Sequence, residues 1–435
     1  MSNTEKVVII GAGFAGLQLA RKLGKTHQHV TLIDKYNYHQ FQPLFYQVAT
    51  ARLEPSSISF PLRKVFQNQK NVHVKYAEAK EIFPGENRVH TTDGDVLYDR
   101  LVIATGCTSN FFGNKEIAEN AYPMKSTMEA MALCNRILLN FEHATHCTPE
   151  ELPYVMNMVV VGGGPTGVEL AGALAEMKRN VLPRDYPNTD FSSLQVYLLE
   201  GSPHTLSPMS AASQQKSQQY LETLGVVVKT NTIVANYDGK TVTLKDGSTI
   251  PSYNLIWAAG VIGSLPQGFG TASMSPRGNR LMVNRYNRVA GYDNIYAVGD
   301  IAYMQTPKYE HGHPQLANVA INQAKNLAAN LASNKAEAQW KEFEYKDPGS
   351  MATVGKRKAV VDLPKFSFQG RLAWFTWMFL HLMLILSVRN RLFIFINWAF
   401  SYFTNDTTLR LILISSRKQL DIVDRMKKLG WTVSE

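Results

Sequence analysis

Two glycine-rich motifs of the form G-x-G-x-x-G carry the clearest chemical signal in this chain. They are Gly11-Ala12-Gly13-Phe14-Ala15-Gly16 and Gly162-Gly163-Gly164-Pro165-Thr166-Gly167. In such a motif the first glycine makes a tight turn, the second lets backbone amides approach a pyrophosphate, and the third lets a helix pack closely on a strand. The alternative is that either cluster is only a tight turn. Two dinucleotide sites in one chain indicate a relay between two dinucleotides.

An acidic residue follows each motif at the end of a second apolar run. Asp34 ends the run 30–33 at about the 20-residue offset where a carboxylate binds ribose hydroxyls. Glu200 ends the run 194–199 and comes later, because the polar stretch 178–193 intervenes, which we interpret as an inserted loop. A carboxylate here repels a 2′-phosphate and no arginine follows it directly, so the second site is predicted to prefer NADH over NADPH.

Strand-like and helix-like segments alternate around each motif, so the same arrangement is expected twice. The first half closes with the apolar run and small-residue turn 101–106, and the second with 255–260. A further strand-like run, 294–300, ends in Asp300 and precedes a helix expected over about 314–331. Ligands of parallel sheets bind at the carboxyl ends of strands, so Asp300 is expected to meet a ligand, with a helix or turn cap as the alternative.

These patterns predict an α/β fold with two Rossmann-like dinucleotide-binding domains, one inserted in the other, plus a C-terminal membrane-associating helical region. Residues 1–112 and 261–335 are expected to form an FAD-binding domain, residues 113–260 an NADH-binding domain, and residues 336–435 a membrane-anchoring region. In this arrangement the flavin is the permanent cofactor and NADH is the exchanging one.

The length and net charge of the chain limit the number of domains and the kinds of binding partner. The 435 residues suit two or three domains, and a net charge of +10 favours an anionic partner. Nucleic acid is not favoured, because the basic residues are dispersed and no binding module is recognisable.

The three cysteines show neither a CxxC pair nor metal-ligand spacing. No metal site, disulfide framework or disulfide-reducing activity is therefore expected, and the cysteines are interpreted as packing or loop residues. The first strand, expected near Lys6, leaves no room for a signal peptide.

Two apolar runs, 372–388 and 392–403, are separated by Arg389-Asn390-Arg391. The first has 17 residues where a membrane span needs about 20, so we favour a monotopic anchor over a spanning hairpin. Aromatic residues in both runs and a basic tail from Arg417 to Lys428 suit an anionic lipid surface. The alternative is a dimer interface or a buried helix pair. A membrane location points to a membrane-dissolved electron acceptor, such as a quinone.

Over essentially its whole length the chain resembles the type II NADH dehydrogenases, the non-proton-pumping NADH:quinone oxidoreductases. The resemblance is carried by two kinds of segment: the dinucleotide motifs with their neighbouring residues, and the flanking segments that follow strands. They are residues 8–16, 39–50, 163–169, 257–261 and 296–300, together with the amphipathic C-terminus.

The resemblance implies a set of cofactor and substrate residues. FAD is expected at Gly11, Ala12, Gly13, Phe14, Ala15, Gly16, Asp34, Lys35, Ala79, Thr105, Gly106, Asp300 and Ala317. NADH is expected at Gly162, Gly163, Gly164, Thr166, Gly167, Glu200 and Gly260. Quinone is expected at Gln47, Asn318, Asn322 and Gln323. It also implies a peripheral location on the cytoplasmic face of a bacterial inner membrane.

The chain departs from the family in two places. The family's Ala-Gln-x-Ala-x-Gln-Gln stretch reads here Ala317-Asn318-Val319-Ala320-Ile321-Asn322-Gln323, so two amides are shorter by one methylene. Some relatives have a lysine near the start of the C-terminal helix, where this chain has Trp377. Hydrogen bonds from this stretch to flavin or quinone oxygens are therefore expected to be weakened or carried by water.

Glu169 is the candidate catalytic residue. It lies two residues after the second motif, on what is expected to be the first turn of a helix, where a carboxylate also interacts well with the helix dipole. The resemblance gives it a second role, proton delivery to the quinone. The competing interpretations of the whole chain are a sulfide:quinone oxidoreductase-like flavoprotein and an NADH-binding redox sensor without rapid turnover.

Overall fold

The computed structural model describes residues 4–333, 335–406 and 409–413, and these form two compact units. Unit 1 comprises Met1–Phe41, Ser59–Phe112 and Gly260–Gly349, and unit 2 comprises Gln42–Ile58, Gly113–Ala259 and Ser350–Glu435, each over its described residues. The basic tail expected to meet lipid, from Arg417 to Lys428, lies outside the described residues.

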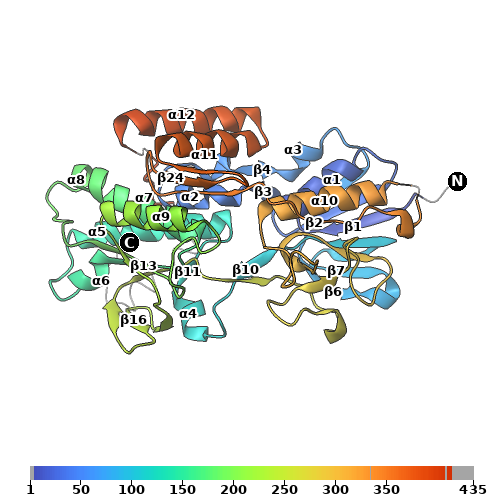
Figure 1. Cartoon of the computed structure of the whole chain (residues 1–435), viewed down its shortest axis with the longest axis horizontal. Helices are drawn as coiled ribbons and strands as arrows, with labels where there is room; N and C mark the ends of the chain where they lie inside the picture. Colours follow the sequence, from blue (N-terminus) through green and yellow to red (C-terminus); the bar gives the residue numbers. More distant parts are fainter. Residues whose placement is uncertain (1–3, 334, 407–408, 414–435) are drawn as a thin grey trace. The chain divides into compact units, whose positions relative to one another are not determined.

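Unit 1 is built on a five-stranded parallel sheet with strand order β21-β9-β1-β2-β5. Its strands are β21 (Ile295–Ala297), β9 (Arg100–Ile103), β1 (Lys6–Ile10), β2 (His29–Asp34) and β5 (Val72–Tyr76). The run 7–10 is buried throughout, as expected for a central strand covered on both faces. Helices α1 (Phe14–Leu23) and α10 (Ala317–Leu331) pack against each other beside this sheet (Figure 1).

Unit 2 repeats this plan with the strand order β11-β18-β12-β13-β14, again parallel. The strands are β11 (Tyr122–Pro123), β18 (Asn254–Trp257), β12 (Asn157–Val161), β13 (Gln195–Leu199) and β14 (Val226–Lys229). Each unit also contains a three-stranded antiparallel sheet, which precedes β9 in unit 1 and β18 in unit 2. These sheets are β6 (Ala79–Phe83), β7 (Arg88–Thr91) and β8 (Gly94–Leu97), and β15 (Val234–Tyr237), β16 (Thr241–Leu244) and β17 (Thr249–Pro251). The expected α/β fold with two Rossmann-like parallel sheets is confirmed.

Outside the C-terminal part, the remaining elements are short, apart from the helices α5, α7 and α9 of unit 2. Unit 1 also contains β3 (Tyr38–Gln40), β4 (Ser59–Pro61), α3 (Leu62–Phe66), β10 (Cys107–Ser109), β19 (Val261–Gly263), β20 (Leu281–Val283), η5 (Gly299–Ile301) and β22 (Ala302–Met304). Unit 2 also contains α2 (Phe45–Ala49), η2 (Pro55–Ser57), α4 (Lys115–Asn120), α5 (Thr127–Ala144), α6 (Leu152–Met156), α7 (Pro165–Asn180), α8 (Leu182–Asp185) and α9 (Ala211–Thr223).

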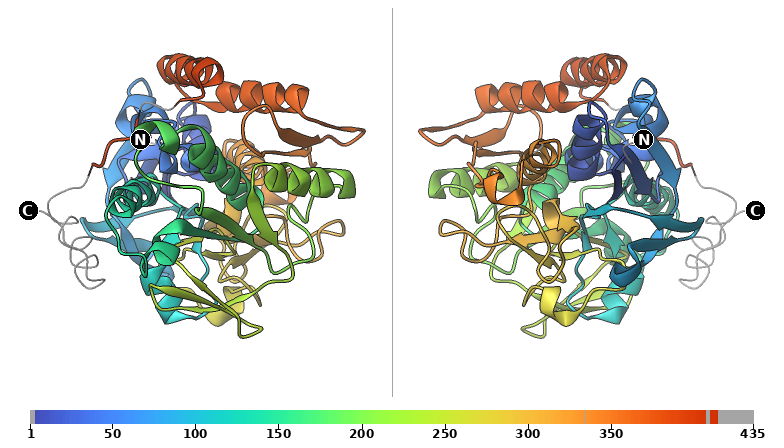
Figure 2. Two further views of the ribbon diagram at one scale, coloured as in Figure 1. Left: turned by 90° about the vertical axis from the view of Figure 1, so that its left-hand side faces the viewer. Right: turned by 90° about the vertical axis from the view of Figure 1, so that its right-hand side faces the viewer.

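The C-terminal part of unit 2 combines a small sheet with two helices. The antiparallel strands β23 (Ser350–Thr353), β24 (Ala359–Asp362) and β25 (Ser367–Gln369) pack against α11 (Arg371–Leu384), and α11 packs against α12 (Val388–Thr404) (Figure 2). No described helix has both the length and the apolar character needed to cross a bilayer. The helices of this region were expected, but the sheet was not.

Three element boundaries differ from the expectation. The stretch 178–193 is not wholly a loop, because α7 continues to Asn180 and α8 follows directly. The helix expected from about residue 314 begins at Ala317, since the backbone of Leu316 is extended. Residues 389–391 lie in the first turn of α12 rather than between two helices, so only 385–387 separate the apolar helices.

Three residues at a spacing of four fix α12 on unit 2. Asn390, Ile394 and Trp398 are its buried residues, whereas Val388 and Phe403 are 78% and 80% exposed. The Asn390 amide Nδ2 donates to the backbone carbonyls of Ser56 and Ser57, at 2.9 Å each. One buried side chain therefore connects α12 to η2, more than 300 residues earlier in the chain.

We predict that Asn390→Ala lowers the free energy of unfolding of unit 2 by about 1–3 kcal/mol, because two carbonyls lose their donor in a buried setting. Urea denaturation followed by tryptophan fluorescence measures this, and amide hydrogen exchange should rise first in α12. Asn188→Ala, at an exposed turn, is the matched control. Identical denaturation curves for the two variants would contradict this role of Asn390.

Candidate functional site

The first glycine motif is shaped by two close backbone contacts and one open position. A Cβ on Gly11, whose φ is +99°, would lie 2.4 Å from the Ala104 carbonyl oxygen, and one on Gly16 would lie 1.8 Å from the Gly11 oxygen. A Cβ on Gly13, the residue before α1, would meet no atom within 4 Å. The fold thus requires the outer glycines, while the middle one borders open space at a helix N-terminus.

The second motif has the same geometry. A Cβ on Gly162, whose φ is +109°, would lie 2.7 Å from the Ala258 oxygen, and one on Gly167 would lie 1.9 Å from the Gly162 oxygen. Gly164, the residue before α7, again borders open space, and Thr166 is exposed in the first turn. Each motif therefore leaves room for an anion at a helix N-terminus, which is what a pyrophosphate requires.

The two predicted acids make equivalent hydrogen bonds. Asp34 accepts from the backbone N–H of Ala12, the second residue of its motif, and from that of Tyr36 at 2.7 Å. Glu200 accepts from the equivalent amide, that of Gly163, and from Ser202 N at 2.7 Å. Burial raises the pKa of Asp34, although both backbone amides counteract the shift. Both carboxylates are thereby held beside the glycine turn.

Other predicted flavin residues of unit 1 gather near this first motif. Gly299, whose φ is +79°, would place a Cβ 3.2 Å from the Cβ atoms of Ala15 and Ala320. Asp300 follows it in η5, since β21 ends earlier than expected, at Ala297. The buried hydroxyl of Thr105 has no hydrogen-bond partner among the described residues. An unpaired buried hydroxyl and an open glycine turn fit a bound polar group such as a dinucleotide.

Cys107 departs from the expectation that the cysteines only fill space. Its thiol donates to the Asp300 carboxylate, with the sulfur 3.0 Å from Oδ2. Cys134 does behave as expected, because it packs in a buried cluster with Ala51 and Leu138. All three cysteines are free thiols, and no metal-binding cluster occurs among the described residues.

The remaining predicted cofactor residues are also found in unit 1. Lys35 is exposed directly after β2, and Ala79 and Ala317 begin β6 and α10. Gly106 and Gly260 both have positive φ angles, +69° and +70°. A Cβ on Gly260 would lie 2.7 Å from the Phe112 ring.

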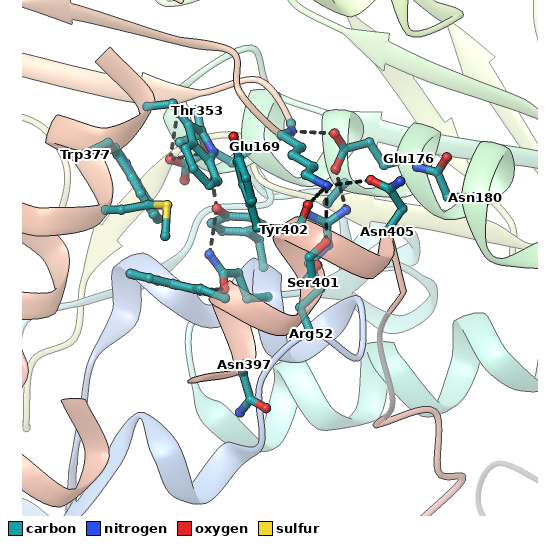
Figure 3. Close-up of a pocket in the computed structure, with 18 of the residues that line it drawn as sticks. Arg52, Glu169, Glu176, Asn180, Thr353, Trp377, Asn397, Ser401, Tyr402 and Asn405 are labelled. Carbon is teal, nitrogen blue, oxygen red and sulfur yellow. Dashed lines mark hydrogen bonds and ion pairs between the residues drawn. The ribbon is translucent and has the colours of Figure 1, made fainter. Parts of the chain in front are cut away.

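Unit 2 contains a pocket lined from five places in the chain: α2, α7, the β23–β24 hairpin, α11 and α12 (Figure 3). Two of the predicted residues, Gln47 and Glu169, line it together. The predicted Asn318, Asn322 and Gln323 lie on α10 of unit 1. Asn318 and Asn322 are exposed there, whereas Gln323 is buried and accepts a hydrogen bond from Gly299 N at 2.8 Å.

Glu169 is a buried acid in this pocket, with 7% exposure. It is the fifth residue of α7, so the expectation that it lies in the first turn is wrong and a helix-dipole role is weakened. Its Oε1 accepts from Thr353 N at 3.3 Å and from Thr353 Oγ1 at 3.4 Å. Burial raises its pKa to about 8, and the Thr353 donors and the nearby Trp377 indole moderate the rise. A proton is therefore available on this carboxyl near neutral pH.

Gln47 uses both ends of its buried amide. Its Oε1 accepts from Trp398 Nε1 at 2.7 Å, and its Nε2 donates to the Tyr46 hydroxyl at 2.9 Å. The Trp377 indole N–H, in contrast, is buried and forms no hydrogen bond of standard geometry with the described residues, although it lies near enough to Glu169 to lower the pKa of that carboxyl. The pocket thus holds a buried indole donor close to a protonatable acid.

The other end of the pocket is charged and already paired. Arg52 Nη2 lies 2.6 Å from Glu176 Oε2, and the Lys356 backbone N–H donates to the same carboxylate. The Lys356 ammonium donates to the carbonyls of Ser401 and Tyr402 at the end of α12, as Figure 3 shows. This end therefore fixes α12 and leaves the Glu169 end for a ligand.

Sequence reasoning missed most residues of this pocket, among them Arg52, Glu176, Thr353, Trp398 and Lys356. Arg52 comes two residues after the recognised segment 39–50, and Glu176 lies on the same helix as Glu169, so both lie close to a recognised sequence motif. Thr353 lies on a strand that was not expected, and Trp398 lies in a helix with apolar residues on both its buried and its exposed sides, so neither carried a local pattern.

Comparison with known protein families and sequences gives one consistent result. The family described as "Pyridine nucleotide-disulphide oxidoreductase" matches residues 5–324, and "NDH2 C-terminal domain" matches residues 348–405. "Type II NADH:quinone oxidoreductase Ndh" of Mycobacterium tuberculosis is 34% identical, covering 97% of this chain and 90% of that protein. NdhA of the same organism is 36% identical, covering 91% and 87%.

Solved structures share the fold at low identity. NDH2 from Plasmodium falciparum, solved in complex with NADH, has a TM-score of 0.85 at 21% identity, covering 93% of this chain and 100% of that chain. The sulfide:quinone oxidoreductase of Aquifex aeolicus has a TM-score of 0.69 at 20% identity, covering 96% and 95%. At these identities the likeness concerns the arrangement of elements.

Within the second motif, Gly164 is expected to serve nucleotide binding and Gly167 to serve folding. We predict that Gly164→Ala leaves the thermal unfolding midpoint unchanged but weakens NADH binding about tenfold, or about 1.4 kcal/mol, because its new methyl enters the open space at the helix N-terminus. Gly167→Ala should lower the midpoint, because its Cβ collides with backbone. Differential scanning fluorimetry and an NADH titration measure the two effects. Equal loss of stability in both variants would contradict this division.

Proposed function

Because this chain belongs to the type II NADH:quinone oxidoreductases, we infer that it transfers two electrons from NADH through FAD to a membrane quinone without pumping protons. FAD supplies the chemistry that accepts a hydride from NADH and passes the electrons on. The observation that carries the inference is the repeated nucleotide cradle, in which an open glycine turn and an amide-bound carboxylate occur twice.

We propose that residues 1–112 and 261–335 hold FAD. The holding residues are Gly11 to Gly16, Asp34, Lys35, Ala79, Thr105, Gly106, Asp300 and Ala317. The open position at Gly13 and the unpaired Thr105 hydroxyl support this assignment. In this proposal Asp34 binds the adenosine ribose and the helix N-terminus of α1 faces the pyrophosphate.

Residues 113–260 are proposed to bind NADH. The binding residues are Gly162 to Gly164, Thr166, Gly167, Glu200 and Gly260. Both oxygens of Glu200 accept protein hydrogen bonds, which fixes the carboxylate where the ribose hydroxyls are expected. The fixed negative charge supports discrimination against the 2′-phosphate of NADPH.

We place the quinone ring in the unit 2 pocket, with Gln47 at its wall and Glu169 as the proton donor. The balance of the reaction is NADH + H⁺ + quinone → NAD⁺ + quinol, so one proton must come from solution. A buried carboxyl whose pKa is about 8 is protonated at neutral pH and suits this task. Asn318, Asn322 and Gln323, which lie on α10 of unit 1, are proposed separately as quinone-contacting residues.

The protein is associated with the membrane, as its family is. We propose that residues 336–435 provide the anchor, and that the exposed apolar residues of α11 and α12 rest on an anionic lipid surface at the cytoplasmic face of a bacterial inner membrane. A second copy of this chain is the alternative occupant of that face, giving a homodimer. Vesicle co-sedimentation compared with sedimentation velocity separates the two occupants.

The competing functions have less support. Sulfur transfer needs several cysteines at the reacting centre, whereas Cys134 is buried in an apolar cluster and Cys147 follows the end of α5. Only Cys107 lies beside a proposed flavin residue, Asp300. A redox sensor without rapid turnover shares both nucleotide cradles but has no need of a buried proton donor in a third pocket. Rapid NADH oxidation with a short-chain quinone distinguishes the enzyme from the sensor.

We predict that Glu169→Gln slows quinone reduction by on the order of a hundredfold while flavin reduction by NADH stays nearly unchanged, because only the second half-reaction needs the proton. In the wild type, quinone reduction should slow as the pH rises through about 8, since the carboxyl loses its proton there. The glutamine variant should lack this decline. Stopped-flow absorbance of the flavin measures both half-reactions.

Glu222→Gln, on the exposed surface of α9, is the control and should behave as the wild type. Equal slowing of both half-reactions by Glu169→Gln would remove Glu169 from the oxidative step.

Glu200→Ala should raise the kcat/KM ratio of NADPH to NADH at least about tenfold, because it removes a fixed negative charge beside the expected 2′-phosphate. Steady-state rates with both nucleotides measure the ratio, and Glu222→Ala provides the control. An unchanged ratio would mean that Glu200 does not determine the nucleotide preference.

A further inference from the structure

A continuous hydrogen-bond chain connects α12 to Glu169 through the interior of unit 2. Trp398 Nε1 donates to Gln47 Oε1 at 2.7 Å, and Gln47 Nε2 donates to Tyr46 Oη at 2.9 Å. Tyr46 Oη lies 3.2 Å from Thr353 Oγ1, which lies 3.4 Å from Glu169 Oε1. The five side chains come from four elements, α12, α2, β23 and α7, that are far apart in the sequence.

The chemistry of the first group sets the direction of the whole chain. An indole N–H can only donate, so Gln47 must turn its carbonyl oxygen toward Trp398 and its amide NH₂ toward Tyr46. The Thr353 hydroxyl donates to Glu169 Oε1, which leaves its oxygen to accept. In the arrangement that we infer, the Tyr46 hydroxyl accepts from Gln47 and donates its own proton to Thr353. Every donor in the chain then points toward the carboxyl group.

Burial maintains this direction. Residues Gln47, Tyr46, Thr353, Glu169 and Trp398 are each between 3% and 8% exposed. Water cannot readily reach these sites to replace a lost hydrogen-bond partner. If the Gln47 amide were flipped, its NH₂ group would face the Trp398 indole N–H, and the two donors would have no acceptor between them. A buried unpaired donor costs about 1–3 kcal/mol, so the reversed arrangement is disfavoured.

The chain makes the two carboxyl oxygens of Glu169 inequivalent. Oε1 accepts from both the backbone N–H and the hydroxyl of Thr353, and neither of these two donors reaches Oε2. A proton on Oε1 would collide with two donors, so the protonated form carries it on Oε2.

We propose that Trp398 is a positioning residue that acts along this chain to hold Oε1 of Glu169, so that Oε2 carries the proton and delivers it to the quinone. The proposal rests on the proposed role of Glu169 as proton donor. The proton leaves Oε2 for a quinone oxygen, the electrons come from NADH, and the carboxylate regains a proton from solution.

Other charged and titratable groups near Glu169 are accounted for. Arg52 and Glu176 form an ion pair with each other, and Lys356 is held by the carbonyls at the end of α12. Tyr46 is a member of the chain, and burial raises its pKa far beyond neutrality. His381 stacks on Trp377, and burial lowers its pKa to about 4, so it is neutral when Glu169 titrates.

The test is the pH at which Glu169 titrates in Trp398→Phe, which keeps an aromatic ring but removes the donor. Gln47 is then free to turn, Thr353 can direct its hydroxyl elsewhere, and the carboxylate loses a donor. The expected result is an upward shift of the pH limit of quinone reduction by about half a unit to one unit. Tyr46→Phe and Thr353→Val should shift it in the same direction, whereas Thr353→Ser should restore the wild-type limit.

A second measurement does not depend on turnover. The infrared C=O band of the protonated carboxyl, assigned by its absence in Glu169→Gln, should persist to higher pH in Trp398→Phe than in wild type. The control is Trp340→Phe, which removes an indole donor to Lys335 O in unit 1 and should leave the band unchanged.

The outcomes separate the two proposals. If Glu169→Gln leaves the pH limit in place, the proton-donor role itself is wrong. If Glu169→Gln removes the limit while Trp398→Phe and Thr353→Val leave both the limit and the infrared band at their wild-type pH, the donor role stands and the positioning role of Trp398 is overturned.

Discussion

The structure depends on the absence of a side chain at the third glycine of each nucleotide motif. A Cβ at Gly16 or Gly167 would lie within 2 Å of the carbonyl oxygen of the first glycine, so α1 and α7 reach their positions only because both residues are glycine. That close packing sets where each helix begins, and hence where its free amides lie. The acids Asp34 and Glu200 are bound to the same turn, so anion site and ribose site are placed together.

The same close packing positions Glu169, the acid that follows the second glycine motif by two residues. Since α7 is held at its start by Gly167, its fifth residue enters the interior of unit 2 instead of the solvent. Glu169 is therefore buried beside Thr353, and burial rather than a neighbouring charge raises its pKa. One helix thus serves two chemistries: its first turn suits a nucleotide, and its second turn presents a protonatable acid.

Much of the fold could be predicted from sequence, because its signals are local. The central strands are continuous apolar runs, and the acids end their second strands at recognisable offsets, as Asp34 does. The polar stretch after residue 178 was misjudged since polar residues on the exposed end of a helix look like a loop. The sheet β23–β25 was missed because its strands have only three or four residues each.

The candidate pocket was predictable only in part. Gln47 and Glu169 lie next to recognised motifs, but the residues that orient them do not. Trp398 contacts Gln47 across 351 positions of sequence, and its burial is decided by which side of α12 meets the protein. An apolar helix gives no pattern that distinguishes that side, whereas the structure shows it as Asn390, Ile394 and Trp398.

Helix α12 consequently has one side exposed and the other packed against the protein interior. Its exposed side is the one proposed to touch lipid, and its opposite side supplies the first donor of a chain that ends at an acid in the interior. Under these two proposals, extraction into detergent, a change of bilayer thickness or a surfactant that tilts this helix would alter the acidity of an almost fully buried carboxyl group. The choice of solubilising agent would then belong among the determinants of catalytic behaviour.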